Sequence, residues 1–140
     1  MKLHFTILFF LIVDSASPKE LLWPTTLGKY FSSNFGENRD DHFHMGVDIK
    51  TNGKIGMEVL AVEDGYISRL RSNYKGYGKA IYQRTNSGHE VVYGHLEAFT
   101  PVMEKIWRLQ QAKRRSYIVD TQFSSRAVSY THLRAHETNS

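Results

Sequence analysis

The sequence of 140 residues contains no cysteine, so disulfide bonds and thiolate metal sites are excluded. It also lacks internal repeats, low-complexity tracts and the clusters of lysine and arginine that are typical of proteins that bind nucleic acid. Its 18 basic and 14 acidic residues leave a net charge of +4, which suits either an anionic polymer or a solvated surface with no particular partner. The length allows one domain, and a hydrophobic content of 41% is enough for a packed core.

The apolar stretch Leu3–Val13 is too short to span a bilayer, which requires about 20 residues. It follows the basic start Met1-Lys2 and precedes the small residues of Asp14–Pro18. This order is typical of a secretory signal peptide, so we expect residues 1–17 to be removed on export, leaving no membrane span. A retained membrane anchor and a buried N-terminal strand are the alternatives.

Between Tyr30 and Tyr93, short segments of strand-forming residues alternate with turn residues. Asp64-Gly65 and Asn86-Ser87-Gly88 are both typical of β-hairpin turns. Strands at this spacing predict an all-β fold with a sandwich-like core of antiparallel sheet. The expected strands are Phe31–Phe35, Gly46–Ile49, Val59–Val62, Tyr66–Leu70, Lys79–Arg84 and Glu90–Tyr93, and the buried side chains should include Val59, Ala61, Ile67 and Ile81.

One helix is expected after these strands, over Pro101–Arg115. Thr100 can cap its N-terminus, and Pro101 suits the first helical position because its missing N–H is not needed there. Basic residues occupy the last turn, where cations interact favourably with the helix dipole. The apolar residues at helical spacing are Val102, Ile106 and Leu109, with Met103 and Trp107 beside them.

His44 and Asp48 stand four residues apart on either side of Gly46. On a straight strand they would be about 13 Å apart, so both can reach one metal only if the chain bends, which a glycine permits. An imidazole and a carboxylate together suit Zn²⁺. A histidine and an aspartate near a glycine are more often loop residues that form ordinary hydrogen bonds, so the spacing alone leaves both interpretations open.

His95 directly follows an expected strand, in the run Tyr93-Gly94-His95-Leu96. A histidine in this position can face a cleft and position a water molecule or stabilise an oxyanion. The alternative is a strand-end histidine that only hydrogen-bonds to a carbonyl group.

Taken in order, several segments resemble the lysostaphin/LytM-type zinc endopeptidases, which cut peptide cross-links in peptidoglycan. The resemblance covers about residues 23–116. It implies zinc as the cofactor, His44 and Asp48 as zinc ligands, His95 as a catalytic residue and a peptidoglycan peptide as the substrate. The segments are Ser32–Gly36, His44–Asp48, Val59–Gly65, Gly76–Lys79 and Tyr93–Leu96.

The sequence departs from this family after the expected helix. There the family carries a His-x-His motif, which supplies a third zinc ligand and a second catalytic histidine, but no such motif follows His95 here. Residues 126–140 do not resemble the family, and we expect a disordered, foreign or out-of-frame tail on a truncated domain of residues 18–125. His132 and His136 have helical spacing, yet the glutamate of a zinc-binding helix is not in place between them.

The sequence therefore predicts an exported, zinc-dependent endopeptidase-type domain with impaired activity. The alternative is a non-catalytic relative that binds cell wall or activates another hydrolase.

Overall fold

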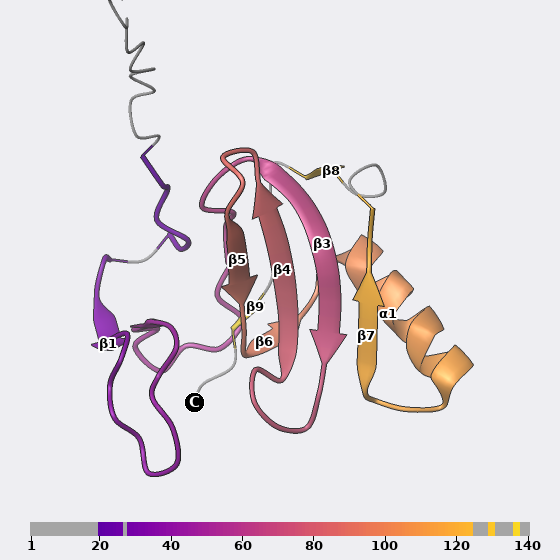
Figure 1. Cartoon of the computed structure of the whole chain (residues 1–140), viewed down its shortest axis with the longest axis horizontal. Coiled ribbons are helices and arrows are strands. Elements are labelled where there is room, and N and C mark those ends of the chain that lie inside the picture. The colour runs from indigo at the N-terminus through magenta and orange to yellow at the C-terminus, as the bar shows by residue number, and fades with distance from the viewer. Residues whose placement is uncertain (1–19, 27, 125–128, 131–135, 138–140) are drawn as a thin grey trace, which may run out of the picture.

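An antiparallel sheet forms the centre of the computed structural model, which describes residues 20–26, 28–124, 129–130 and 136–137. Its strands lie side by side in the order β5-β4-β3-β7, and β8 also pairs with β3 (Figure 1). The predicted fold class of antiparallel strands with one helix is confirmed. The strands of this sheet are β3 (Gly65–Ser72), β4 (Lys79–Thr85), β5 (Glu90–Tyr93), β7 (Val119–Gln122) and β8 (Ser129–Tyr130).

Two smaller antiparallel pairs complete the strands of the described part of the chain. β1 (Phe31–Ser33) pairs with β2 (Asp48–Ile49), and β6 (Leu96–Ala98) pairs with β9 (His136–Glu137). The predicted signal peptide, residues 1–17, lies outside the described residues, as do most of the predicted tail and the side chains of His132 and His136. No helix in the described part is long and apolar enough to cross a membrane.

One of the two predicted hairpins is confirmed. Asn86-Ser87-Gly88 joins β4 to β5, with Gly88 at a φ of 90°. The hairpin predicted at Asp64-Gly65 is wrong, because β3 pairs with β4 across the loop of residues 73–78. A Cβ atom on Gly65 would lie 2.2 Å from the carbonyl oxygen of Arg84, so this glycine permits the close approach of β4.

The segment expected to form the other half of that hairpin pairs with the N-terminal residues instead. Val59 forms an isolated bridge with Thr25, and the N–H groups of Leu60 and Leu22 donate to the carbonyl oxygens of Pro24 and Val62. Such partners, distant in sequence, leave no local pattern for a hairpin rule to detect.

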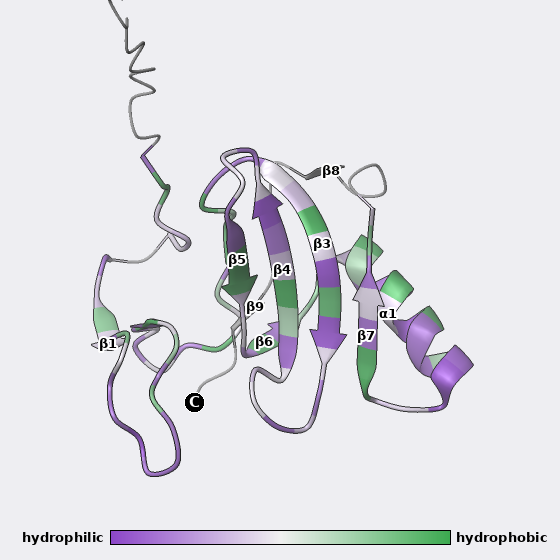
Figure 2. Ribbon diagram, viewed as in Figure 1, coloured by the Kyte–Doolittle hydropathy of each residue, from purple (hydrophilic) through white to green (hydrophobic). Residues whose placement is uncertain are grey.

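The core includes apolar residues of β3, β4, β5 and β7, and green and purple bands alternate along β3 (Figure 2). Ile67 and Leu70 are both buried although they are three residues apart, because a shift in register between Ile67 and Arg69 realigns the strand. The four side chains predicted to be buried are confirmed. The core residues are Val59, Ala61, Ile67, Leu70, Ile81, Tyr93, Leu96, Phe99, Met103, Trp107 and Val119.

The single helix of the described residues, α1 (Pro101–Arg114), begins at the predicted residue and ends one residue before the predicted end. The Thr100 hydroxyl accepts a hydrogen bond from the N–H of Met103, and Arg115 caps the C-terminus in the left-handed conformation at φ 50°. The buried face is different from the one predicted, since Met103 and Trp107 are buried while Leu109 is 61% exposed. The indole N–H of Trp107 donates to the Ser72 hydroxyl at 2.8 Å and turns this face towards the sheet.

Glu63 lies in a bend just before β3, yet it is buried. Its residue is only 4% exposed, and its carboxylate accepts hydrogen bonds from the N–H and the hydroxyl of Ser87. Buried carboxylates require such partners, so Glu63 connects the start of β3 to the β4–β5 turn.

Candidate functional site

A short loop after β1 folds back on itself and presents His44. The N–H of Gly36 donates to the His44 carbonyl at 2.7 Å, and the N–H of His44 donates to the Glu37 carbonyl at 2.8 Å. Asn38 and Phe43 form a bridge nearer the tip. Residues 36–44 therefore form a small hairpin that returns the chain to the start of β2.

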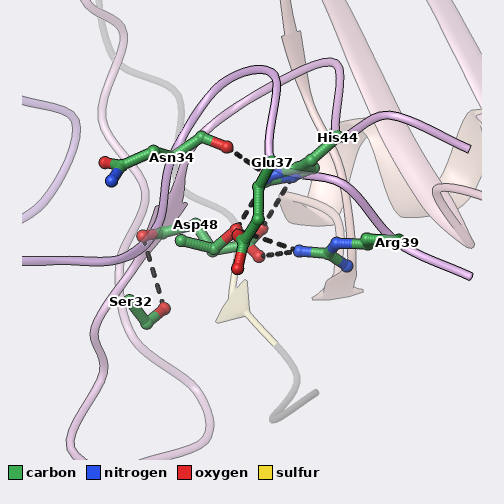
Figure 3. Close-up of polar contacts among 7 residues, drawn as sticks. Ser32, Asn34, Glu37, Arg39, His44 and Asp48 are labelled. Atoms are coloured by element: carbon green, nitrogen blue, oxygen red, sulfur yellow. Dashed lines mark hydrogen bonds and ion pairs between the residues drawn. The ribbon is translucent and has the colours of Figure 1, made fainter.

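The bend at Gly46 brings the side chains of His44 and Asp48 together (Figure 3). His44 Nε2 lies 3.3 Å from Asp48 Oδ1, whereas a straight strand would separate the two residues by about 13 Å. The His44 side chain is 15% exposed and the Asp48 side chain 32%. The structure thus places both predicted residues in one site, while their role as zinc ligands stays a prediction.

Each of these two side chains has a second set of polar contacts on its far side (Figure 3). His44 Nδ1 lies 2.9 Å from the Ser33 hydroxyl and 3.1 Å from the Asn34 carbonyl oxygen. Asp48 Oδ2 accepts a hydrogen bond of 2.7 Å from the Arg39 guanidinium, and the same nitrogen lies 3.1 Å from the Ser33 hydroxyl. These contacts leave His44 Nε2 and Asp48 Oδ1 facing each other.

The separation of these two atoms fits a zinc ion. Ligands held about 2.0–2.2 Å from a tetrahedral Zn²⁺ lie about 3.3–3.6 Å apart, and the observed distance is 3.3 Å. The Asn34 carbonyl oxygen can only accept, so its contact with Nδ1 requires the proton of a neutral ring to lie on Nδ1. Nε2 is then a bare acceptor opposite a carboxylate oxygen, an arrangement that a cation between them would stabilise.

His95 is held in an uncommon backbone conformation at the end of β5. Its φ is 56°, and its N–H donates to the carbonyl oxygen of Tyr77 at 2.8 Å. The two rings meet edge to face with their centres 6.4 Å apart. A Cβ atom on the preceding Gly94 would lie 3.0 Å from the Tyr77 ring, so the glycine allows Tyr77 to pack against this turn.

A groove of about 1060 Å³ contains all three predicted residues. His44 and Asp48 line it from the loop side, and His95 lines it from the end of β5. Apolar side chains that are partly exposed form much of its remaining surface, and they include Leu21, Leu22, Phe31, Met45, Val47 and Val92. An opening of this size and composition can accept a short extended peptide.

Tyr93 closes the inner side of the groove. Its hydroxyl donates to Gln83 Oε1 at 2.7 Å and accepts from the N–H of Val62 at 3.0 Å. Burial raises the pKa of Tyr93 to about 12. The phenol is therefore neutral around pH 7 and acts as a structural donor beneath the site.

His42 does not join the site. It is exposed, and its ring contacts the neighbouring Asp41 carboxylate, which lowers the pKa of Asp41. Within the described residues, no group of three or more His, Cys, Asp or Glu side chains could hold a metal ion.

The contacts of Ser33, Glu37 and Arg39 with the site were not predicted. Ser33 lies in a segment that carried the family resemblance, and Gly36 marks the turn that folds Glu37 and Arg39 back towards it. These are the two signals in the sequence that could have located them.

Comparisons with known proteins identify the family. The sequence matches the model of peptidase family M23 over residues 42–137, which is more than half of the chain. The matched region includes Asp48 and His95 as well as the sheet β5-β4-β3-β7 and α1. The chain therefore belongs to peptidase family M23. Comparisons with curated proteins and with solved structures found no match.

Proposed function

We propose that this chain is a zinc-dependent endopeptidase-type domain that acts on the peptide cross-links of peptidoglycan. One observation carries the proposal: His44 Nε2 and Asp48 Oδ1 face each other at 3.3 Å in a groove that also contains His95. Membership of a peptidase family supports hydrolysis of a peptide bond. The resemblance to lysostaphin-type enzymes supports peptidoglycan as the substrate, and the signal-peptide pattern of residues 1–17 supports export.

The residues of the groove have separate roles in this proposal. His44 and Asp48 would hold the zinc, which when bound polarises a scissile carbonyl and makes water more acidic, from a pKa of about 15.7 towards 7. His95 would accept a proton from the attacking water or donate a hydrogen bond to the developing oxyanion. Its fixed backbone limits the positions that the imidazole can take, which favours catalysis by orientation.

We further propose that turnover by this chain is impaired. Catalytic zinc normally has three protein ligands, and no His-x-His motif follows His95 to supply the third. The same observation favours the second candidate function, a non-catalytic relative that binds cell wall or activates a hydrolase.

Zinc content measured beside hydrolysis of a peptidoglycan peptide tests both candidates. Replacement of residues 126–140 by strands that carry a His-x-His motif should strengthen zinc binding more than tenfold, on the order expected for an added ligand. It should also bring peptidase activity. A replacement that binds no more zinc than the present chain would contradict the assignment of the site.

In the variant with residues 126–140 replaced, two substitutions separate zinc binding from catalysis. His95→Ala should keep the zinc and lose turnover, whereas Asp48→Ala should lose both. Zinc content that is unchanged in Asp48→Ala would sink the proposed ligand set. Recovery of secreted protein that still carries Met1, identified by mass spectrometry, would refute the proposed export with cleavage near Ser15–Ser17.

A further inference from the structure

A set of polar groups contacts Nδ1 of His44, the ring nitrogen that faces away from Asp48. The Ser33 hydroxyl lies between the Glu37 carboxylate and His44 Nδ1, and it contacts both. Ser33 ends β1, while Glu37 lies on the loop hairpin, so two separate segments meet at the ring. Neither residue has a role in the function proposed above.

The hydrogen bonds among these polar groups can be assigned by counting the hydrogen atoms that each group can donate. A serine hydroxyl has one hydrogen, and an ionised carboxylate can only accept, so the Ser33 hydroxyl donates to Glu37 Oε2. Its oxygen is then left to accept from His44 Nδ1 at 2.9 Å and from Arg39 at 3.1 Å. The Asn34 carbonyl oxygen, 3.1 Å from the same Nδ1, can only accept and so also requires the proton to lie on Nδ1.

The geometry points to Ser33 and Glu37 as positioning residues that hold His44 in the tautomer with the proton on Nδ1 and a bare Nε2. In that tautomer the lone pair of Nε2 points at the position between His44 and Asp48, where the proposed function requires a metal. In the other tautomer, Nε2–H would donate to Asp48 Oδ1 and close that position. Ser33, oriented by Glu37, favours the first tautomer together with the Asn34 carbonyl.

The test uses the whole chain and two readouts, of which the first does not depend on zinc. Long-range ¹H–¹⁵N NMR at about pH 8, where a histidine of ordinary pKa is neutral, reports the tautomer of each imidazole. The signals of His44 are identified by their loss in His44→Gln. Calorimetric titration with zinc alone then gives the affinity.

The wild-type ring should carry its proton on Nδ1. Ser33→Ala leaves the Asn34 carbonyl as the remaining acceptor of Nδ1–H, so it should lower the share of this tautomer without abolishing it. It should weaken zinc binding by about 10–100-fold, the usual effect of removing the partner of a ligand. Ser33→Thr keeps a hydroxyl and should restore both readouts, and Glu37→Gln should fall between Ser33→Ala and the wild type. Ser32→Ala is the matched control, because that hydroxyl contacts the backbone carbonyl of Asp48 at 3.4 Å and not the His44 ring.

The inference would be overturned by a wild-type ring protonated on Nε2, or by a Ser33→Ala variant with unchanged tautomer and zinc affinity. If Ser33→Ala fails to fold, Glu37→Gln and Ser33→Thr still decide the matter, because Glu37 is exposed and threonine suits a strand. The inference concerns the proposed zinc site, yet the two can fail separately. A tautomer that changes in Ser33→Ala while no variant binds zinc supports the positioning role and contradicts the proposed function.

Discussion

The sheet with its helix and the loops that hold the candidate site are stabilised in different ways. Ile67, Leu70, Ile81 and Val119 are at most 1% exposed, and burial of each large aliphatic side chain contributes about 1.5–3 kcal/mol. The side chains of Asp48 and Arg39, by contrast, are 32% and 41% exposed, and ion pairs of this kind contribute about 0–1 kcal/mol. The site therefore depends on the framework for its place but contributes little to the stability of the fold.

Removal of a framework side chain should have the largest effect on stability. Trp107→Ala removes a buried aromatic side chain, its hydrogen bond to Ser72 and its contact with the Lys79 ammonium, which lies 4.3 Å from the ring centre. We expect a loss of about 3–5 kcal/mol in the free energy of unfolding, measured with denaturant. Leu109→Ala on the exposed face of the same helix is the control and should cost less than about 0.5 kcal/mol. Equal losses in the two variants would mean that the helix does not pack as described.

Tyr93 belongs to the sheet and also lines the groove, so its replacement tests how each of these two regions is stabilised. Tyr93→Phe removes the hydroxyl that pairs with the Val62 N–H and with Gln83 Oε1, and should cost about 1–3 kcal/mol. Since folding raises the pKa of Tyr93 from 10.0 to about 12, the neutral phenol stabilises the fold fully below pH 10, and this contribution is lost as the pH rises towards 12.

Unfolding measured across that alkaline range should show a decline in wild type that is smaller in Tyr93→Phe. Tyr30→Phe, which changes a tyrosine that is 70% exposed, serves as the control. If Tyr93→Phe and Tyr30→Phe show the same alkaline decline, Tyr93 is not buried in solution.

The smallest effect is expected at an ion pair on the outer surface of the sheet. Arg69 donates to both oxygens of Asp120, and these hydrogen bonds lower the pKa of the Asp120 carboxyl below 3.8. The pair therefore stabilises the fold above pH 3.8, and its contribution is lost as the pH falls through the lowered value. Because both side chains are about a third exposed, Asp120→Asn should cost no more than about 1 kcal/mol at neutral pH.

The difference in stability between wild type and Asp120→Asn should vanish in acid. Thermal unfolding at neutral pH and at a pH below the lowered pKa of Asp120 measures this difference. A difference that grows on acidification would show that the sign of the linkage is wrong.

Local patterns in the sequence predicted the parts of the fold that local contacts decide. The cap at Thr100 and the turn at Asn86-Ser87-Gly88 involve residues close in sequence, and both were predicted correctly. The partners of Val59 and of β3 were missed, because they are chosen by packing between distant segments. The rotation of α1 was missed for the same reason, since Ser72 sets it from another element.

The candidate site was likewise predicted in part, and the contacts between separate segments were missed. The order of short segments indicated His44, Asp48 and His95, and the structure places them in one groove. The contacts of Ser33, Glu37 and Arg39 depend on how residues 36–44 fold back, which no periodicity in the sequence records. Helical or strand spacing describes one element at a time, whereas these contacts form between a strand end and a loop.

The position of β7 in the chain has a consequence for the protein during its synthesis. β7 covers one edge of β3, and the N–H of Val119 donates to the Ser72 hydroxyl across 47 positions of sequence. At a translation rate of about 5–20 residues per second, β3 is complete about 2–9 seconds before Val119 is added. During this interval an uncovered strand edge can pair with a neighbouring nascent chain. The yield of correctly folded protein should therefore depend on how fast the ribosome passes through residues 73–118, which separate β3 from β7.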